Sequence, residues 1–361
     1  MLSKKYVFTV VVFVLWIVGF FGISDVFGLD LLETLSRINP LSVFLGFMFY
    51  ALAVLTSVWI LYGCLRGVQL NPPVRGIGKA WVFGSFIDNI GPTVTPLGEA
   101  SMAYFLEKFY RVSYVKSLAG IGMYVSSWGL SVSFFSIISL VVIQVFEGLS
   151  SLISGPMIAL LMIAIFIFVL ITAGWFLLIM NKGLVERIVC RVVRIYNKIY
   201  NKFKRRKVTF EHCVFRIEFE KSYSALEIFM KNKRQMMAYT LAFIVPQMTH
   251  VACMYFILLG FGVQVPFLAL LLVHIVSSVT GLVSFIPSGT GVYELVSSST
   301  LQGVVARAVP DGISAGNIAV AAVFLYRLIF VWTTNFIGGL IGILQGVEQT
   351  GHLDEAPNVV N

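Results

Sequence analysis

The segment that decides the fold reads IPSGTGVYE over residues 286–294, and a counterpart reads IGPTVTPLGE over residues 90–99. Each interrupts a long apolar stretch with proline and glycine, and each carries a glutamate, Glu294 or Glu99. Backbone N–H and C=O groups find no water inside a bilayer, so such a break persists only where it lines a cavity enclosed by protein. An ionisable side chain at that depth adds a cost of roughly 2.5–3.5 kcal/mol unless it is paired or hydrated. Two such breaks predict a protein that holds or moves a ligand within a membrane.

The composition is that of an integral membrane protein. Apolar residues make up 58% of the chain and charged residues 12%, with a mean hydropathy of +0.91, whereas soluble domains contain about 25% charged residues. Apolar runs near the ~20 residues needed to span a bilayer cover residues 6–23, 41–63, 117–146, 152–180, 236–261 and 316–344. The first run follows Lys4 and Lys5 but exceeds the apolar core of a signal peptide, so we interpret it as an uncleaved helix.

The sequence gives little support for soluble-type catalysis or for a bound metal. Its cysteines and histidines form no C-x-x-C pair and no H-E-x-x-H motif, and it has no Walker A loop and no dinucleotide fingerprint. A G-x-S-x-G match at residues 312–316 lies before a membrane run without a strand-turn-helix context, so we treat it as chance. We expect no cofactor, no metal and no catalytic residue.

Basic residues orient the chain. Of the 26 Lys and Arg residues, 15 lie between residues 181 and 234, against five acids, which places this segment in the cytoplasm by the positive-inside rule. The bases at 4–5, 66–79 and 108–116 agree, whereas the acidic loop 25–40 faces outward. The predicted fold is therefore an all-α polytopic protein of the cell (plasma) membrane, with about six full spans and both termini in the cytoplasm.

These sides constrain the two broken segments. Residues 80–106 must enter and leave on the same side, as a re-entrant helix pair broken at 92–96. Residues 266–305, broken at 287–291, would form a second pair entered from the opposite side, which makes an inverted repeat with its site at the midplane. Two ordinary short spans at 266–285 and 292–308 are the alternative. We expect one membrane domain over residues 1–350, with the basic segment 181–235 inserted and a disordered tail at 351–361.

The basic segment has an amphipathic pattern. Its bases recur at three- and four-residue steps and so share one helical face: Arg187, Arg191, Arg194, Lys198 and Lys202. A neighbouring apolar stripe suits a helix lying on the anionic inner leaflet, and a solvated cytoplasmic loop is the alternative. We expect membrane lipids as partners and no nucleic acid.

Small residues in the apolar runs indicate helix packing. Gly338, Gly342 and Gly346 recur every four residues, which allows close packing within the chain or in a homodimer. The serines of the apolar runs are interpreted as hydrogen-bonding glue between helices: Ser126, Ser127, Ser277, Ser278 and Ser284.

The breaks supply the candidate binding residues. A discontinuous helix exposes N–H groups and partial positive charge at its half-helix N-terminus, which attracts phosphate or carboxylate. Arg327 is the one base in the last apolar run, and it should pair with Glu294 or with a bound phosphate. The predicted substrate-binding residues are Pro96, Gly98, Glu99, Pro287, Gly289, Gly291, Glu294 and Arg327, with Asp88, Asn89 and Tyr326 as secondary candidates.

These motifs resemble those of the lysylphosphatidylglycerol synthase transmembrane-domain family, also called flippase-like domain proteins. PLGEA at 96–100 with AYFL at 103–106 is similar to one family segment, IPSGTGVYE to the family's Ile-Pro-Gly-Gly-x-Gly-x-x-Glu, and LYRL at 325–328 to its terminal Leu-Tyr-Arg-Leu. Ser101 and Met102 stand where the family usually has an arginine, and residues 124–128 lack its charged pair. The first half of the site is less charged than the family pattern.

The resemblance implies lipid translocation. In fused family members this domain flips an aminoacylated phospholipid made by a soluble synthase domain, and stand-alone members are thought to move phospholipids or polyprenyl-phosphate-linked lipids. We expect a flippase-like transporter of an anionic or phosphate-bearing lipid. The alternatives are a membrane-embedded lipid-modifying enzyme that uses an intramembrane glutamate, and a non-transporting scaffold that recruits a partner through residues 181–234.

Overall fold

The computed structural model describes residues 31–91, 96–145, 233–309 and 314–345, together with Val14 and residues 162–163, 165–170, 172–174, 181, 183, 187 and 191. All regular structure in these ranges is helical, as the sequence predicts. The expected helix at 6–23, most of the run at 152–180, the basic segment beyond 191 and the tail at 351–361 lie outside the described residues. Arg187 and Arg191 are helical and exposed.

Within the described ranges, four helices are long and apolar enough to cross a membrane, and they coincide with four of the six predicted runs. They are α3 (Pro40–Gly67), the first part of α6 (Tyr114–Val145), the pair α11 (Lys233–Ala242) and α12 (Ile244–Gly260), and the helix formed by α15 (Ala315–Arg327), the π-turn η2 (Leu328–Trp332) and α16 (Thr333–Leu344). A short helix, α2 (Leu31–Ser36), precedes α3. The chain is a helical membrane protein.

The first broken segment forms two short helices. α4 (Val74–Ile90) and α5 (Leu97–Tyr110) have 17 and 14 residues, or about 25 and 21 Å of helix, less than the ~30 Å hydrocarbon core. A Cβ on Gly76, at the start of α4, would lie 2.6–2.9 Å from ring atoms of Tyr110, at the end of α5. The start of α4 and the end of α5 therefore lie side by side, so the two helices form a hairpin.

The second broken segment is also a pair of short helices. α13 (Phe267–Val283) leads into the single turn η1 (Pro287–Gly289), and α14 (Val292–Val305) returns alongside α13. The backbone is strained at the break, because Phe285 and Ser288 have φ values of 60° and 54°. These values lie in the left-handed region of the Ramachandran plot, which residues other than glycine rarely adopt. Gly289 fits closely: a Cβ there would lie 2.8 Å from Cα of Gly281 on α13.

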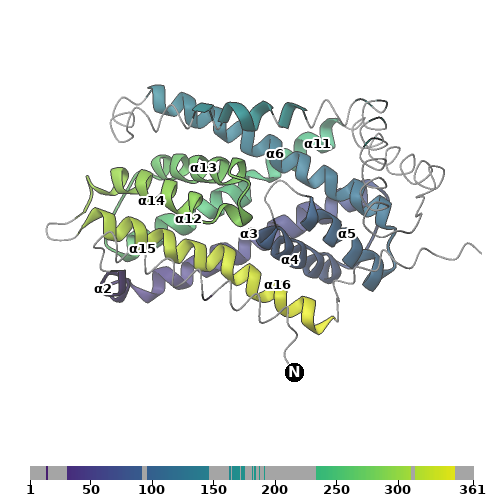
Figure 1. Cartoon of the computed structure of the whole chain (residues 1–361), viewed down its shortest axis with the longest axis horizontal. Coiled ribbons are helices and arrows are strands. Elements are labelled where there is room, and N and C mark those ends of the chain that lie inside the picture. The colour runs from purple at the N-terminus through teal and green to yellow at the C-terminus, as the bar shows by residue number, and fades with distance from the viewer. Residues whose placement is uncertain are drawn as a thin grey trace, which may run out of the picture.

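The two broken pairs meet inside the bundle. In Figure 1, α12, α13 and α14 lie on one side and α4 and α5 on the other, while α15–α16 runs diagonally from the first group to the second. η1 contacts α4, so the second break touches the helix that ends at the first. α16 crosses α4 closely, because a Cβ on Gly338 would lie 2.5 Å from Cβ of Phe86, and one on Gly342 would lie 3.0 Å from the Phe83 ring. These two glycines therefore serve packing within the chain.

The helix ends follow local sequence signals. Asn39 caps α3 by accepting a hydrogen bond from the Leu41 amide at 3.0 Å, and Pro40 occupies the first helical position. The Asn39 amide donates to the Gly260 carbonyl at 3.0 Å, which joins the start of α3 to the end of α12. This contact fixes the antiparallel pairing of the two helices.

The hairpin geometry predicts which loops share a side of the membrane. Single cysteines at positions 75 and 111, in a cysteine-free chain, should react with an impermeant thiol reagent from the same side of the membrane. A cysteine at 204 should react from that side too, because the positive-inside rule places the basic segment in the cytoplasm. Cysteines at 30 and 311 should react only from the opposite side. Opposite labelling of 75 and 111 would contradict the first hairpin, and labelling of 311 from the cytoplasm would contradict the opposed arrangement of the two pairs.

Candidate functional site

A buried ion pair joins the second break to the last long helix. Arg327 Nε donates to Glu294 Oε1 at 2.7 Å, and the two residues are 4% and 8% exposed. Glu294 lies in the first turn of α14 and Arg327 at the end of α15, directly before the π-turn. The pairing expected from the sequence is therefore confirmed, and it links two helices in the interior of the protein, where an unpaired charge is costly.

The same pair satisfies the backbone of the break. Glu294 Oε2 accepts the Gly291 amide at 2.7 Å, and Arg327 Nη2 donates to the Ser288 carbonyl at 3.0 Å. The guanidinium also lies over the ring of Tyr293, 4.9 Å from its centroid, a cation–π contact. An N–H and a C=O that the interrupted helix leaves without helical partners are thus bonded by one glutamate and one arginine.

The first break uses a different carboxylate for the same purpose. Asp88, near the end of α4, accepts the Gly98 amide at the start of α5 at 2.7 Å. A Cβ on Gly98 would collide with the Asp88 carboxyl group, which explains why glycine stands there. Both half-helix N-termini thus carry a carboxylate of this chain, so the expectation that their amides stand free for an anion is wrong for Gly98 and Gly291.

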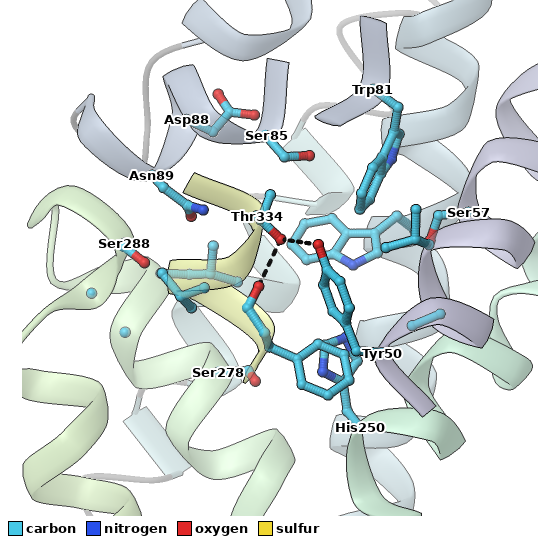
Figure 2. A pocket seen from close by; sticks show the side chains of 18 of the residues that line it. Tyr50, Ser57, Trp81, Ser85, Asp88, Asn89, His250, Ser278, Ser288 and Thr334 are labelled. Atoms are coloured by element: carbon cyan, nitrogen blue, oxygen red, sulfur yellow. Dashed lines mark hydrogen bonds between the residues drawn. The ribbon is translucent and has the colours of Figure 1, made fainter. Parts of the chain in front are cut away.

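A cavity of about 430 Å³ lies between the broken pairs. Figure 2 shows Ser85, Asp88 and Asn89 on one side, Ser288 and Ser278 on another, and Tyr50 and His250 below. Polar and aromatic residues from α3–α6, α12–α16 and the turns η1 and η2 line it: Tyr50, Ser57, Trp81, Ser85, Asp88, Asn89, Glu99, Tyr124, Trp128, His250, Ser278, Ser288, Tyr293, Tyr326, Arg327, Phe330 and Thr334.

The charges around this cavity are unevenly placed. Asp88 and Glu99 come from the first broken pair and interact electrostatically with each other. Arg327, which lines the cavity from the end of α15, already has Glu294 as its partner. Among the described residues no base forms an ion pair with Asp88 or Glu99, and no group of His, Cys, Asp and Glu is arranged to hold a metal. The cavity therefore has an acidic wall and a wall with a neutralised arginine.

Hydrogen bonds fix many of the lining side chains. Thr334 donates to the Phe330 carbonyl and accepts from Tyr50 at 2.9 Å, as the dashed lines in Figure 2 show. Trp81 Nε1 donates to the Tyr124 hydroxyl at 2.8 Å, and the Tyr326 hydroxyl bonds Nδ1 of His250 at 2.8 Å. The hydroxyl groups of these lining residues thus already have hydrogen-bond partners within the protein.

The histidines extend this network away from the cavity. The ring of His250 stacks on His274 with a centroid separation of 5.0 Å, and His274 Nε2 donates to Gln247 Oε1 at 3.1 Å. No sequence motif indicated these contacts, because the residues lie on α12, α13 and α15 without regular spacing. The one available signal was the presence of two histidines in apolar runs.

The predicted site residues divide into two groups. Those that line the cavity are Glu99, Gly289, Arg327, Asp88, Asn89 and Tyr326. The others lie outside its lining and support it: Gly98, Gly291 and Glu294 through the hydrogen bonds above, and Pro96 and Pro287 at the exposed helix ends. Asn89 also donates to Asn335 on α16 at 2.8 Å, which joins the first break to the last helix.

The interpretation of the serines as glue between helices needs correction. Ser277 and Ser284 donate to carbonyls of their own helix, those of Val273 and Gly281. Ser278 lines the cavity instead. Serine hydroxyls in helices often bond the carbonyl one turn earlier, so their presence in apolar runs does not by itself indicate a contact with another helix.

Comparisons with known proteins agree with the motifs. The family described as the lysylphosphatidylglycerol synthase TM region matches residues 6–338. A UPF0104 membrane protein of Pyrococcus horikoshii is 24% identical over 316 residues, which are 86% of this chain and 89% of the relative. The family match includes both breaks and the segment that contains Arg327.

The ion pair predicts a specific pattern of stabilities. Glu294→Gln or Arg327→Gln alone should lower the free energy of unfolding by about 3–5 kcal/mol, because each leaves the other charge buried without a partner. The double change should recover much of this loss, as measured by thermal unfolding of the purified protein. Strictly additive effects of the two changes would show that the residues do not interact.

The contact between Asp88 and Gly98 predicts a second effect. Gly98→Ala should lower the melting temperature, because the new methyl group must displace the carboxylate that caps α5. Gly122→Ala on α6 is the matched control, since a Cβ there meets nothing within 4 Å and alanine favours the helix. If both changes leave the melting temperature unchanged or raise it, the close contact at the first break is absent.

Proposed function

Since the chain belongs to the lysylphosphatidylglycerol synthase transmembrane-region family, we propose that it is a transporter that moves a phosphate-bearing lipid between the leaflets of a membrane. The observation that carries this proposal is the position of the cavity. It lies where two interrupted helix pairs meet, within an otherwise apolar helical protein. Broken helices in membranes are tolerated where they line a cavity of this kind, and in transporters they form the substrate site.

Two lining residues, Arg327 and Gly289, offer groups that could bind a phosphate. Arg327 lines the cavity and uses Nε and one Nη2 hydrogen for Glu294 and Ser288, which leaves further N–H groups of the guanidinium for a ligand. Gly289 brings backbone to the cavity without a side chain. A phosphate bonded to Arg327 would extend the existing Glu294 pair into a network, and such networks are how buried charges are usually accommodated.

The acyl chains of the substrate would remain in the bilayer while its head group passes through the cavity. Phe285 and Ile286, beside the second break, are 61% and 39% exposed. Apolar side chains at this position would face lipid in a membrane and bring the bilayer to the edge of the break. We therefore propose that the head group enters the cavity beside η1.

The proposal includes a location and an orientation. We place the protein in the plasma membrane with both termini in the cytoplasm, and we propose that the basic face at Arg187, Arg191, Arg194, Lys198 and Lys202 lies on the anionic inner leaflet. Clustered bases near a membrane surface contribute about 1 kcal/mol each to such binding. The predicted re-entrant pairs and their inverted repeat belong to the same proposal, because they give the site equivalent access from either side.

A transport assay with a cavity-filling variant tests this function. The purified protein in liposomes should accelerate the exchange of acyl-labelled phospholipid between leaflets, measured as the fraction of label that a membrane-impermeant reductant reaches. Ser278→Trp should abolish this acceleration, because a large side chain would fill the space between the two breaks. The matched control is Ser299→Trp, whose position on α14 is exposed.

The comparison of these two variants decides the outcome. Both should retain the melting temperature within a few degrees, which separates a blocked cavity from a damaged fold. Loss of exchange in Ser278→Trp alone supports a path through the cavity. Equal exchange by Ser278→Trp and the unchanged chain would contradict the proposal, as would exchange no faster than in protein-free liposomes.

A further inference from the structure

We infer that the cavity binds a quaternary ammonium group, so that the transported head group is zwitterionic, with its phosphate toward Arg327 and its ammonium between Asp88, Glu99 and the aromatic wall. This inference rests on the proposed function for its lipid part. The binding of the ammonium group itself depends only on the cavity.

The charge of the cavity favours a cation. Asp88 and Glu99 line it without a basic partner among the described residues, while the charge of Arg327 is balanced by Glu294. A purely anionic head group would therefore meet two carboxylates and a neutralised arginine. A ligand with a cation at one end relieves the repulsion between Asp88 and Glu99, because an opposite charge within a few ångströms stabilises both carboxylates.

One face of α4 presents this acidic wall. Trp81, Ser85 and Asp88 are spaced by four and three residues, so they project from the same side of the helix, and all three line the cavity. In Figure 2 the indole of Trp81 and the side chains of Ser85 and Asp88 follow one another along this face. Glu99, on α5, lines the same cavity and lies within electrostatic range of the Tyr124 hydroxyl.

Aromatic rings supply the rest of a cation site. The rings concerned come from α3, α4 and α6 and all line the cavity: Tyr50, Trp81, Tyr124 and Trp128. Rings attract a cation placed over their faces, and tryptophan attracts it most strongly. The chain already contains one such contact at this cavity, between the Arg327 guanidinium and the Tyr293 ring.

The hydrogen bonds of the wall favour a quaternary over a primary ammonium. A primary ammonium carries three N–H donors; the Asp88 and Glu99 carboxylates can accept from it, but the hydroxyls of Tyr50, Tyr124 and Tyr326 already have protein partners. A quaternary ammonium has no N–H groups, so it loses less on leaving water than a primary ammonium does, and it gains from ring faces. Two neighbouring carboxylates beside aromatic rings therefore suit a quaternary ammonium group.

Different elements supply the charges that orient the ligand. Asp88 and Glu99 come from the first broken pair, whereas Arg327 ends α15 and donates to the Ser288 carbonyl at the second break. A phosphocholine-like group has its anion and its cation at opposite ends, and it can therefore satisfy both walls at once. The shared chemistry is that of a lipid head group or of a free phosphocholine ester, and the experiment distinguishes them.

Binding is measured first with soluble probes on the purified full-length protein. Phosphocholine should raise the melting temperature and bind measurably by calorimetry, phosphoethanolamine should bind more weakly, and glycerol 3-phosphate, which lacks the cation, should bind weakest. Glu99→Gln should weaken phosphocholine binding about tenfold or more, because it removes a charge beside the cation. Asp88→Asn should act in the same direction, and its amide oxygen can still accept the Gly98 amide.

Matched controls exclude general effects of charge and of ring removal. Glu107→Gln lies on α5 with Glu99 but is exposed, and Trp59→Leu replaces a tryptophan of α3 that is 74% exposed. Both should leave phosphocholine binding unchanged, whereas Trp81→Leu should weaken it. Equal or tighter binding of glycerol 3-phosphate or phosphoethanolamine, or full phosphocholine binding by Glu99→Gln, would overturn the inference.

Transport separates this inference from the proposed function. In liposomes, acyl-labelled phosphatidylcholine should exchange faster than acyl-labelled phosphatidylglycerol, and Glu99→Gln should remove that preference. Phosphocholine binding without exchange of either lipid would support the ammonium site with a soluble ester as ligand, and it would contradict the transport proposal. Faster exchange of phosphatidylglycerol, with no effect of Glu99→Gln, would contradict the ammonium site and leave transport supported.

Discussion

The bond between Glu294 and Arg327 is the interaction on which the second half of the structure depends. A helix interrupted within a bilayer leaves N–H and C=O groups that neither water nor lipid can satisfy. Glu294 accepts one of these N–H groups and Arg327 donates to one of these carbonyls, while the two side chains neutralise each other. Because Arg327 ends α15 and Glu294 lies in the first turn of α14, the pair also fixes the distance between the break and the last long helix. The cavity keeps its shape because one wall is held in this way.

The first half of the molecule meets the same constraint with less charge. Asp88 caps α5 alone, without an arginine, and Asn89 joins the break to α16 through Asn335. Since Glu99 has no basic partner among the described residues, two carboxylates remain on this wall. The cavity is thus lined by two carboxylates without a basic partner and by one paired arginine, and this distribution of charge, more than the volume, determines which head group it can accept. Ser288, which has a positive φ and stands where the family motif has glycine, lines the same cavity.

Much of this arrangement follows from the sequence. Apolar runs and proline–glycine breaks predicted the four described long helices and the two interrupted pairs, and the isolated Arg327 indicated its pairing with Glu294, because a lone base in a membrane segment requires a partner. The capping of Gly98 by Asp88 was not predictable, since it depends on the angle at which α5 returns along α4. The aromatic wall and the bond between His250 and Tyr326 join helices distant in sequence, and their residues have no common spacing. Gly338 and Gly342 showed that a close contact exists, but only the structure identified α4 as the partner.

The central claim is that the cavity, as its residues are arranged here, holds a lipid head group when the protein is in a membrane. Cryo-electron microscopy of the full-length protein, bound to an antibody fragment in nanodiscs of phosphatidylcholine, measures the positions of these residues and the contents of the cavity at once. The account predicts Arg327 bonded to Glu294 and to the Ser288 carbonyl, with head-group density between Arg327 and the wall formed by Asp88 and Glu99. An intact helical bundle in which Arg327 and Glu294 are apart, and in which side chains fill the space between the two breaks, would contradict it.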